Sequence, residues 1–145
     1  MRVTLKQAQR MLFWFGLRYI PLIGFCSPKI REMSDNHLAV SMPHTWRTKN
    51  HLGSIYFGAL AIGADLAGAF LVFSKARERG INANFAFKDV KGEFLKRPEA
   101  EVWFRSNDGA LIDDMLDESL ATGQRINKTV SVTITCPSLH GDEPM

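Results

Sequence analysis

The sequence is poor in cysteine: it contains only Cys26 and Cys136, which do not form a C-x-x-C pair. Two isolated thiols cannot complete a thiolate zinc site or build a disulfide scaffold. We expect both side chains to be buried as small hydrophobic groups. This usage suits a reducing compartment and favours a cytoplasmic protein.

Several motifs that carry enzyme chemistry are also missing. The chain has no G-x-S-x-G elbow, no H-E-x-x-H, no P-loop and no G-x-G-x-x-G. The histidines His37, His44, His51 and His140 do not show metal-ligand spacing. We therefore expect no metal site, no dinucleotide and no other cofactor.

Neither the composition nor the charge is extreme. Of the 145 residues, 46% are hydrophobic and 23% are charged, with a net charge of +3, close to the averages of globular domains. Because dense basic runs, zinc-finger spacing and RNP-like aromatic patterns are missing, we expect no nucleic acid partner. We expect one domain over residues 1–145, whose more basic first half favours an anionic ligand or a membrane surface.

Apolar residues at helical spacing predict an amphipathic helix within residues 1–20, ended by Pro21. Its apolar face consists of Leu5, Ala8, Leu12, Phe15, Gly16 and Tyr19. We favour a helix packed on the domain. A lipid-facing helix with a basic polar face remains the alternative, although we do not expect membrane contact.

Alternation and β-branched residues predict the strands. Residues 29–33 and 37–42 should form a hairpin, because the turn-prone triplet Ser-Asp-Asn separates them. Further strands are predicted over residues 84–94, 99–105 and 127–136. The fold is therefore expected to contain an antiparallel sheet.

Another helix is predicted before the last strand. Its apolar positions are Leu111, Ile112, Met115, Leu116 and Leu120, with Asn107 or Asp108 as the N-cap. The acids on this helix are Asp113, Asp114, Asp117 and Glu118. Because no calcium-loop glycine pattern accompanies them, we expect a solvated face and not a cation site. Residues 137–145 are expected to be a loose tail.

The most hydrophobic segment, residues 50–74, contains one acid, Asp65. The acid near its middle and the positive charges on both flanks argue against a transmembrane span. Its glycines and alanines predict a helix buried on nearly all sides and wrapped by the sheet. An ionised carboxylate in such surroundings costs on the order of several kcal/mol unless it is paired or faces a functional cavity. Asp65 therefore either anchors the helix through hydrogen bonds or catalyses a reaction, and the composition does not choose between these roles.

A polar, glycine-containing stretch precedes this helix. Asn50 and His51 come before Gly53 and Ser54, where we expect the helix to begin. Free N–H groups and the positive end of the helix dipole gather at such a start, where they can stabilise a carbonyl oxygen that gains charge. Asn50 also fits the ordinary role of an N-cap or loop residue.

The stretch NHLGSIYFGALAIGAD resembles the signature of the hotdog-fold thioesterases, in the branch related to the phenylacetate-pathway (PaaI-like) enzymes. Active members of that branch read Asn-x-x-Gly-Thr-x-His-Gly-Gly, followed by an Asp on the same helix. Asn50, Gly53 and Ser54 stand where the family has Asn, Gly and Thr. Gly58 matches the last glycine, and Asp65 has the spacing of the catalytic acid.

The resemblance covers residues 29–136, and the flanking features resemble an uncharacterised subgroup. It implies an α+β hotdog fold, in which a curved antiparallel sheet wraps a long central helix, with an extra N-terminal helix. It also implies a homodimer or a dimer of dimers, since the family's site forms between subunits. Arg47, Lys96 and Arg97 could meet CoA phosphates, although we favour ordinary surface positions for them.

The resemblance further implies hydrolysis of an acyl-CoA or acyl-carrier-protein thioester, without a cofactor. Asp65 would act as a general base or as the nucleophile, and Asn50 would orient substrate or water. Backbone N–H groups near Tyr56, Phe57 and Gly58 would stabilise the oxyanion.

Two substitutions separate this sequence from the active members. Tyr56 replaces the histidine and Phe57 replaces the first glycine of the His-Gly-Gly element. A phenol can still donate a hydrogen bond, but the added bulk narrows the site. The alternative function is therefore a non-catalytic hotdog protein that binds acyl thioesters or lipids.

Overall fold

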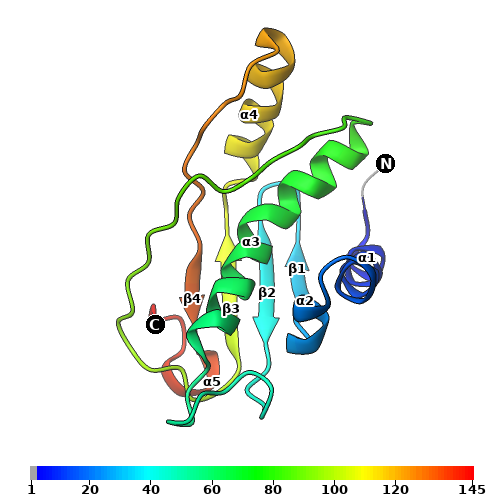
Figure 1. The fold of residues 1–145 in the computed structure, drawn as a ribbon. Coiled ribbons are helices and arrows are strands. Elements are labelled where there is room, and N and C mark those ends of the chain that lie inside the picture. The colour runs from blue at the N-terminus through cyan, green and yellow to red at the C-terminus, as the bar shows by residue number, and fades with distance from the viewer. Residues whose placement is uncertain (1–2) are drawn as a thin grey trace.

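The N-terminal segment forms two helices. In the computed structural model, which describes residues 3–145, helix α1 spans Leu5–Arg18 and helix α2 spans Pro21–Cys26 (Figure 1). Helix α1 begins with a capping box formed by Thr4 and Gln7. Pro21 both follows the predicted helix and starts the next one, because the first helical position needs no N–H donor. Residues 1 and 2 of the predicted helix lie outside the described residues.

Four strands form one antiparallel sheet in the order β1-β2-β3-β4. Their bounds are Lys29–Met33, Leu38–Met42, Val102–Ser106 and Thr133–Thr135. The predicted hairpin of the first two strands is confirmed. Val40 of β2 pairs with Ile30 on one side and with Phe104 on the other.

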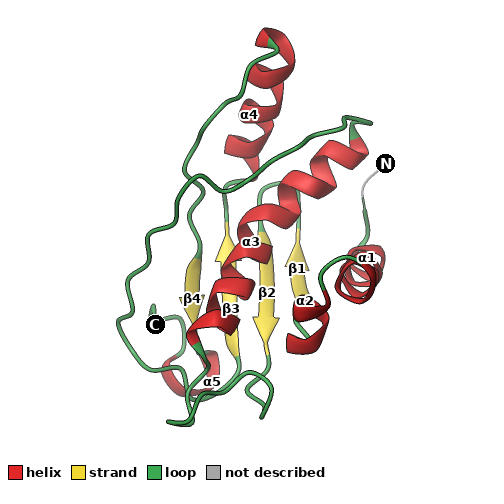
Figure 2. Cartoon of the chain, in the orientation of Figure 1, coloured by secondary structure: helices red, strands yellow, loops and turns green. Residues whose placement is uncertain are grey.

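The later strands are shorter than predicted. Residues 84–94 form no strand, and the predicted strand 127–136 is reduced to Thr133–Thr135 (Figure 2). All of residues 84–94 are exposed. As a strand, this segment would have one apolar face, and nothing in a single chain covers that face. Its β-propensity alone is therefore not enough to pair it with the sheet. The sheet is correspondingly narrow.

The central helix α3 spans Phe57–Glu78 and crosses one face of the sheet (Figure 1). A Cβ placed on Gly63 would lie 2.2 Å from the Phe104 ring, so the helix approaches the sheet closely at this glycine. The expectation that this helix is buried on nearly all sides is wrong. Phe57, Ala61 and Asp65 are exposed on its outer side, because the sheet covers only the other face.

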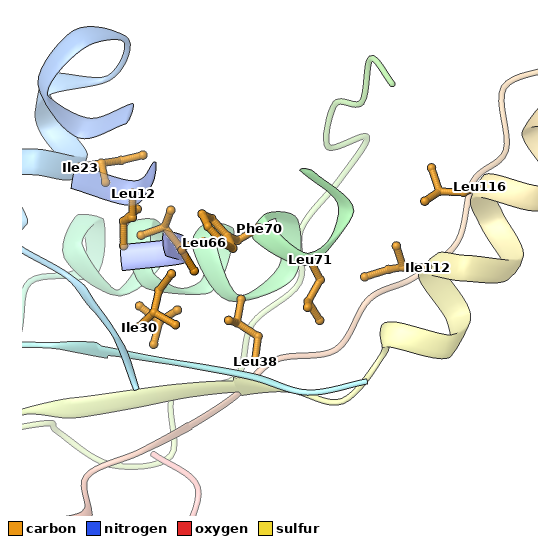
Figure 3. Packing of buried hydrophobic residues seen from close by; sticks show 11 residues of the cluster. Leu12, Ile23, Ile30, Leu38, Leu66, Phe70, Leu71, Ile112 and Leu116 are labelled. Atoms are coloured by element: carbon orange, nitrogen blue, oxygen red, sulfur yellow. The ribbon is translucent and has the colours of Figure 1, made fainter. Parts of the chain in front are cut away.

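Helix α3 is long and apolar enough to cross a bilayer by length and composition. However, 56% of its most apolar window is buried inside the fold, and core helices satisfy the same criterion. Its inner side chains join a core with residues from α1, α2, the sheet and a later helix (Figure 3). That core includes Leu12, Ile23, Ile30, Leu38, Leu66, Phe70, Leu71, Ile112 and Leu116. We therefore interpret α3 as a core helix of the domain.

Helix α4 spans Gly109–Thr122, as predicted, with Asp108 at the N-cap. The Asp108 side chain accepts a hydrogen bond from Ser131 N–H (2.6 Å) and does not cap the helix. The expectation of a purely solvated acidic face is corrected in part, because Asp113 pairs with Lys75 of α3 (2.6 Å). Within residues 3–145, no group of three or more His, Cys, Asp or Glu side chains could hold a metal ion.

The C-terminal tail is not loose. Helix α5 spans Pro137–His140, and Met145 is only 7% exposed. Met145 N–H donates to Ile134 O (2.9 Å), which returns the end of the chain to β4. The polar composition of the tail predicted a loose segment, but the hydrophobic Met145 side chain is buried and holds the tail on the domain.

Candidate active site

The polar segment before α3 folds into a closed turn. Asn50 N–H donates to Ser54 O (2.8 Å), while Asn50 Oδ1 accepts from Leu52 N–H (2.9 Å) and Ser54 N–H (3.2 Å). Gly53 adopts φ of +81°, a conformation that side chains resist. The prediction that the helix begins at Gly53 or Ser54 is therefore wrong, since α3 begins at Phe57.

Two side chains from other segments hold this turn. His44 Nε2 lies 2.6 Å from Gly53 O, and Arg97 donates to Leu52 O (2.9 Å) and to Ser54 Oγ (3.1 Å). Arg97 thus stabilises the turn that precedes α3. The sequence did not reveal these contacts, because the arginine lies 43 residues away from Ser54.

The start of α3 presents backbone donors. Tyr56, the N-cap, makes no side-chain capping bond, and its N–H donates to Thr48 O (2.7 Å). The N–H groups of Phe57 and Gly58 belong to the first helical turn, where no intrahelical acceptor exists. The donors at the positive end of this helix are therefore those of Phe57 and Gly58, and not that of Tyr56.

The two residues that depart from the family pattern lie on this helix start. Tyr56 is 56% exposed and its ring covers Gly58, since a Cβ there would lie 2.5 Å from Tyr56 Cε1. Phe57 is 60% exposed, and its ring centroid lies 5.6 Å from that of Phe94. Both side chains therefore add bulk beside the residues that carry the backbone donors.

Asp65 lies on the exposed side of α3. It forms no hydrogen bond or ion pair with any residue between positions 3 and 145. Although the residue as a whole is exposed, its surroundings partly desolvate the carboxyl, and this raises its pKa above the ordinary value. Among residues 3–145, Asp65 therefore has no polar partner through which it could anchor the helix.

The predicted site residues fall into two separate groups. Asn50, Gly53 and Ser54 share the turn, and Tyr56 to Gly58 follow directly after it. Asp65 comes eight residues after Phe57 in α3, which is about 12 Å along the axis at 1.5 Å per residue. The carboxylate and the helix-start donors therefore cannot contact one carbonyl group within a single chain.

Two hollows on the surface lie elsewhere along α3. One of about 440 Å³ is lined by residues that include Val72, Ala76 and Phe85. Another of about 250 Å³ is lined by residues that include Met33 and Lys75. Neither includes Asp65 or the turn, so neither hollow forms part of the candidate site.

Solved structures share the fold of this chain. A protein of unknown function from Chlorobaculum tepidum TLS is 17% identical, with a TM-score of 0.78 over 91% of this chain and 81% of its own. A Pseudomonas aeruginosa protein described as a probable thioesterase is 17% identical, with a TM-score of 0.74 over 99% of this chain and 90% of its own. A thioesterase from Haemophilus influenzae is 11% identical, with a TM-score of 0.60 over 99% and 85%.

These similarities establish the fold. The chain has the hotdog fold, as the resemblance of its central segment predicted, and its structural neighbours include proteins named as thioesterases. No curated protein sequence matches it. Residues 8–102, more than half of the chain, match the model of DUF4442, a domain of unknown function. The protein is therefore a member of the DUF4442 family, which agrees with the uncharacterised hotdog subgroup that its sequence resembles.

Proposed function

We propose that this protein hydrolyses acyl thioesters of CoA or of an acyl carrier protein. The thioesterase names of its structural neighbours support this class of reaction. The observation that carries the proposal is Asp65, an exposed carboxylate with a raised pKa and no polar partner within residues 3–145. Such a group is available to accept a proton.

The chemistry follows from the groups at hand. As a general base, Asp65 takes a proton from water while the water oxygen attacks the thioester carbonyl carbon. The carbon–sulfur bond then breaks, the thiol leaves with a proton, and the free acid remains. A raised pKa brings the carboxylate closer to the operating pH, which makes it a better proton acceptor. As a nucleophile, the same carboxylate would form an acyl anhydride that water opens.

Backbone and amide groups complete the proposed machinery. The Phe57 and Gly58 N–H groups stabilise the oxyanion at the positive end of α3. Asn50 uses its side-chain oxygen within the turn. Its amide nitrogen is therefore the group that orients substrate or water.

We place this machinery between two copies of the chain. The separation of about 12 Å along α3 means that one subunit supplies Asp65 and the other supplies the Phe57 and Gly58 donors. Exposed apolar side chains around the helix start and the following segment support this contact, with exposed fractions of 60% for Phe57, 57% for Phe87 and 62% for Phe94. A cytoplasmic homodimer or dimer of dimers, working without a cofactor, is the assembly that we propose.

Binding without hydrolysis is the second candidate. Tyr56 covers Gly58, and Phe57 contacts Phe94, so both departures from the active pattern add bulk at the oxyanion donors. A protein with this arrangement would hold an acyl thioester or a lipid while leaving it intact.

The test is turnover of a panel of acyl-CoA and acyl-carrier-protein substrates by the full chain. We expect Asp65→Asn to lower kcat by roughly 10²–10⁴-fold, the usual contribution of a general base. Asp114→Asn, which alters an exposed acid on α4, is the matched control and should retain wild-type activity. Melting temperatures of both variants check folding.

Wild-type protein that binds acyl-CoA in calorimetry, with no turnover of any substrate, would favour the binding candidate. In that case the double variant Tyr56→His and Phe57→Gly tests whether the added bulk suppresses catalysis. Turnover that survives Asp65→Asn would remove Asp65 from the mechanism.

A further inference from the structure

Helix α1 has apolar side chains on two opposite sides. Ala8 and Leu12 face the core and are 0% and 2% exposed. Phe13, Trp14 and Leu17 lie on the other side and are 61%, 58% and 60% exposed. A surface helix of a globular protein ordinarily places polar residues there, so this outer side indicates a contact with something else.

Helix α2 also exposes apolar side chains, and one of them, Phe25, packs against the Trp46 ring. Leu22 and Phe25 are 60% and 46% exposed, whereas Ile23 is buried. A Cβ on Gly16 would lie 2.8 Å from Gly24 N, so α1 and α2 are packed backbone to backbone. The two helices thus pack against each other as one unit. We call five of its exposed apolar side chains the N-terminal surface; they are Phe13, Trp14, Leu17, Leu22 and Phe25.

The segment that carries the N-terminal surface has charged side chains of one sign, although Glu78 of α3 accepts a hydrogen bond from Val3 N–H beside its start. Residues 1–31 contain no Asp or Glu. Lys6 and Arg10 lie on the outer side of α1, seven residues before Phe13 and four residues before Trp14 respectively, and Arg18 follows Leu17. All three cations are exposed, and none forms an ion pair within residues 3–145. Their charge is therefore available to an anionic partner.

We propose that the N-terminal surface docks the protein on anionic lipid membranes. Phe13, Leu17 and the apolar side chains of α2 would enter the boundary between headgroups and acyl chains, with both helices lying along the interface. Trp14 suits the headgroup level, where amphipathic rings concentrate. Lys6, Arg10 and Arg18 would contact lipid phosphates.

A second copy of the chain fits this surface less well. A two-fold contact would place the same patch on both sides, so the unpaired cations would meet cations. An anionic bilayer complements both the apolar side chains and their charge. This inference does not depend on thioester hydrolysis, since it uses no residue of the proposed active site.

Co-sedimentation of the full chain with vesicles tests the proposal. We expect binding to vesicles that contain phosphatidylglycerol, weaker binding to pure phosphatidylcholine, and a loss of binding as salt rises. The variant Lys6→Gln, Arg10→Gln, Arg18→Gln should bind anionic vesicles roughly 100-fold more weakly, since each basic residue contributes about fivefold.

The apolar part is tested by Phe13→Ser, Trp14→Ser, Leu17→Ser, which should abolish vesicle binding. The matched control is Val90→Ser, Leu120→Ser, Leu139→Ser, which changes side chains that are 92%, 59% and 52% exposed elsewhere. This control should bind like the wild type, and circular dichroism should show all variants folded.

Three results would overturn the proposal. Wild-type protein could stay in solution with every vesicle, or the control could lose as much binding as the N-terminal variant. Finally, the variant Phe13→Ser, Trp14→Ser, Leu17→Ser, but not the control, could lower the sedimentation coefficient in the absence of vesicles. That result would show that the N-terminal surface mediates contacts between copies of the chain.

Discussion

Asp65 shows how a single side chain responds to apolar surroundings. Burial raises its pKa in the folded chain, so folding favours the protonated form. A raised pKa stabilises the native state below the unfolded-state pKa, and this stability is lost as pH rises through the folded-state pKa. The ionised Asp65 carboxylate therefore lowers the stability of the native state at neutral pH. Its proposed function would explain why an acid stands at this position.

We predict that Asp65→Asn does not lower the melting temperature at about pH 7 and raises it slightly, since the neutral amide removes this destabilising charge. The difference from the wild type should disappear near about pH 3, where Asp65 itself becomes protonated. Calorimetry of both proteins at the two pH values measures this. A clear drop at neutral pH would mean that the carboxylate makes a stabilising contact in the assembled protein.

The cysteines provide a second prediction at this scale. Cys26 is 4% exposed and Cys136 is 0% exposed, which confirms the expectation that both are buried. Burial raises the pKa of the Cys26 thiol, and Arg47 opposes this shift. Because the thiolate is the reactive form, we expect a thiol reagent to modify the native protein slowly and both thiols rapidly in guanidinium chloride. Rapid labelling under native conditions would contradict this burial.

At the scale of the element, two glycines of α3 face different neighbours. A Cβ on Gly63 would lie 2.2 Å from Phe104, whereas a Cβ on Gly68 would meet only Val130 and Val132 at 3.8 Å. The first spacing is a clash between packed elements, and the second is ordinary contact. The helix therefore needs glycine at one of these positions and not at the other.

We predict that Gly63→Ala lowers the free energy of unfolding by about 1–3 kcal/mol, the usual effect of overpacking. Gly68→Ala serves as its control and should leave stability unchanged or raise it by up to about 1 kcal/mol, since alanine is the better helix former. Urea unfolding of both variants gives the comparison. Equal destabilisation by the two changes would show that helix packing at Gly63 is not the cause.

The elements also show where prediction from sequence succeeds. The hairpin of β1 and β2 and the helix α4 follow from turn residues and local periodicity, which a short segment carries by itself. The strand expected over residues 84–94 does not form, because pairing needs a partner edge that the segment cannot specify. The same limit explains why α3 begins after the Asn50 turn, which Arg97 stabilises from a position 43 residues after Ser54.

At the scale of the whole molecule, the segment after α3 exposes apolar side chains, and one of them, Phe94, contacts Phe57 of the proposed site. Phe87, Phe94 and Leu95 are 57%, 62% and 62% exposed. Large exposed apolar patches ordinarily mark contact sites. We infer that a second copy covers these side chains.

We predict that the protein sediments as a dimer or larger assembly. The double variant Phe87→Ser and Leu95→Ser should dissociate it and lower the proposed thioesterase activity by at least about tenfold, because the proposed site takes groups from both subunits. Leu139→Ser, which removes a side chain that is 52% exposed on α5, is the control and should leave the assembly intact. A wild-type monomer with full activity would contradict the shared site.

The sequence by itself determined the hotdog resemblance, the central helix and Asp65 as its only acid before the last turn, because these features lie in one continuous segment. Only the tertiary structure decided that Asp65 is exposed, that Asn50 serves a turn, that the tail packs on β4, and that α1 is apolar on both sides. The physical reason is that periodicity records which side chains can be buried. Burial itself depends on which distant segments cover them.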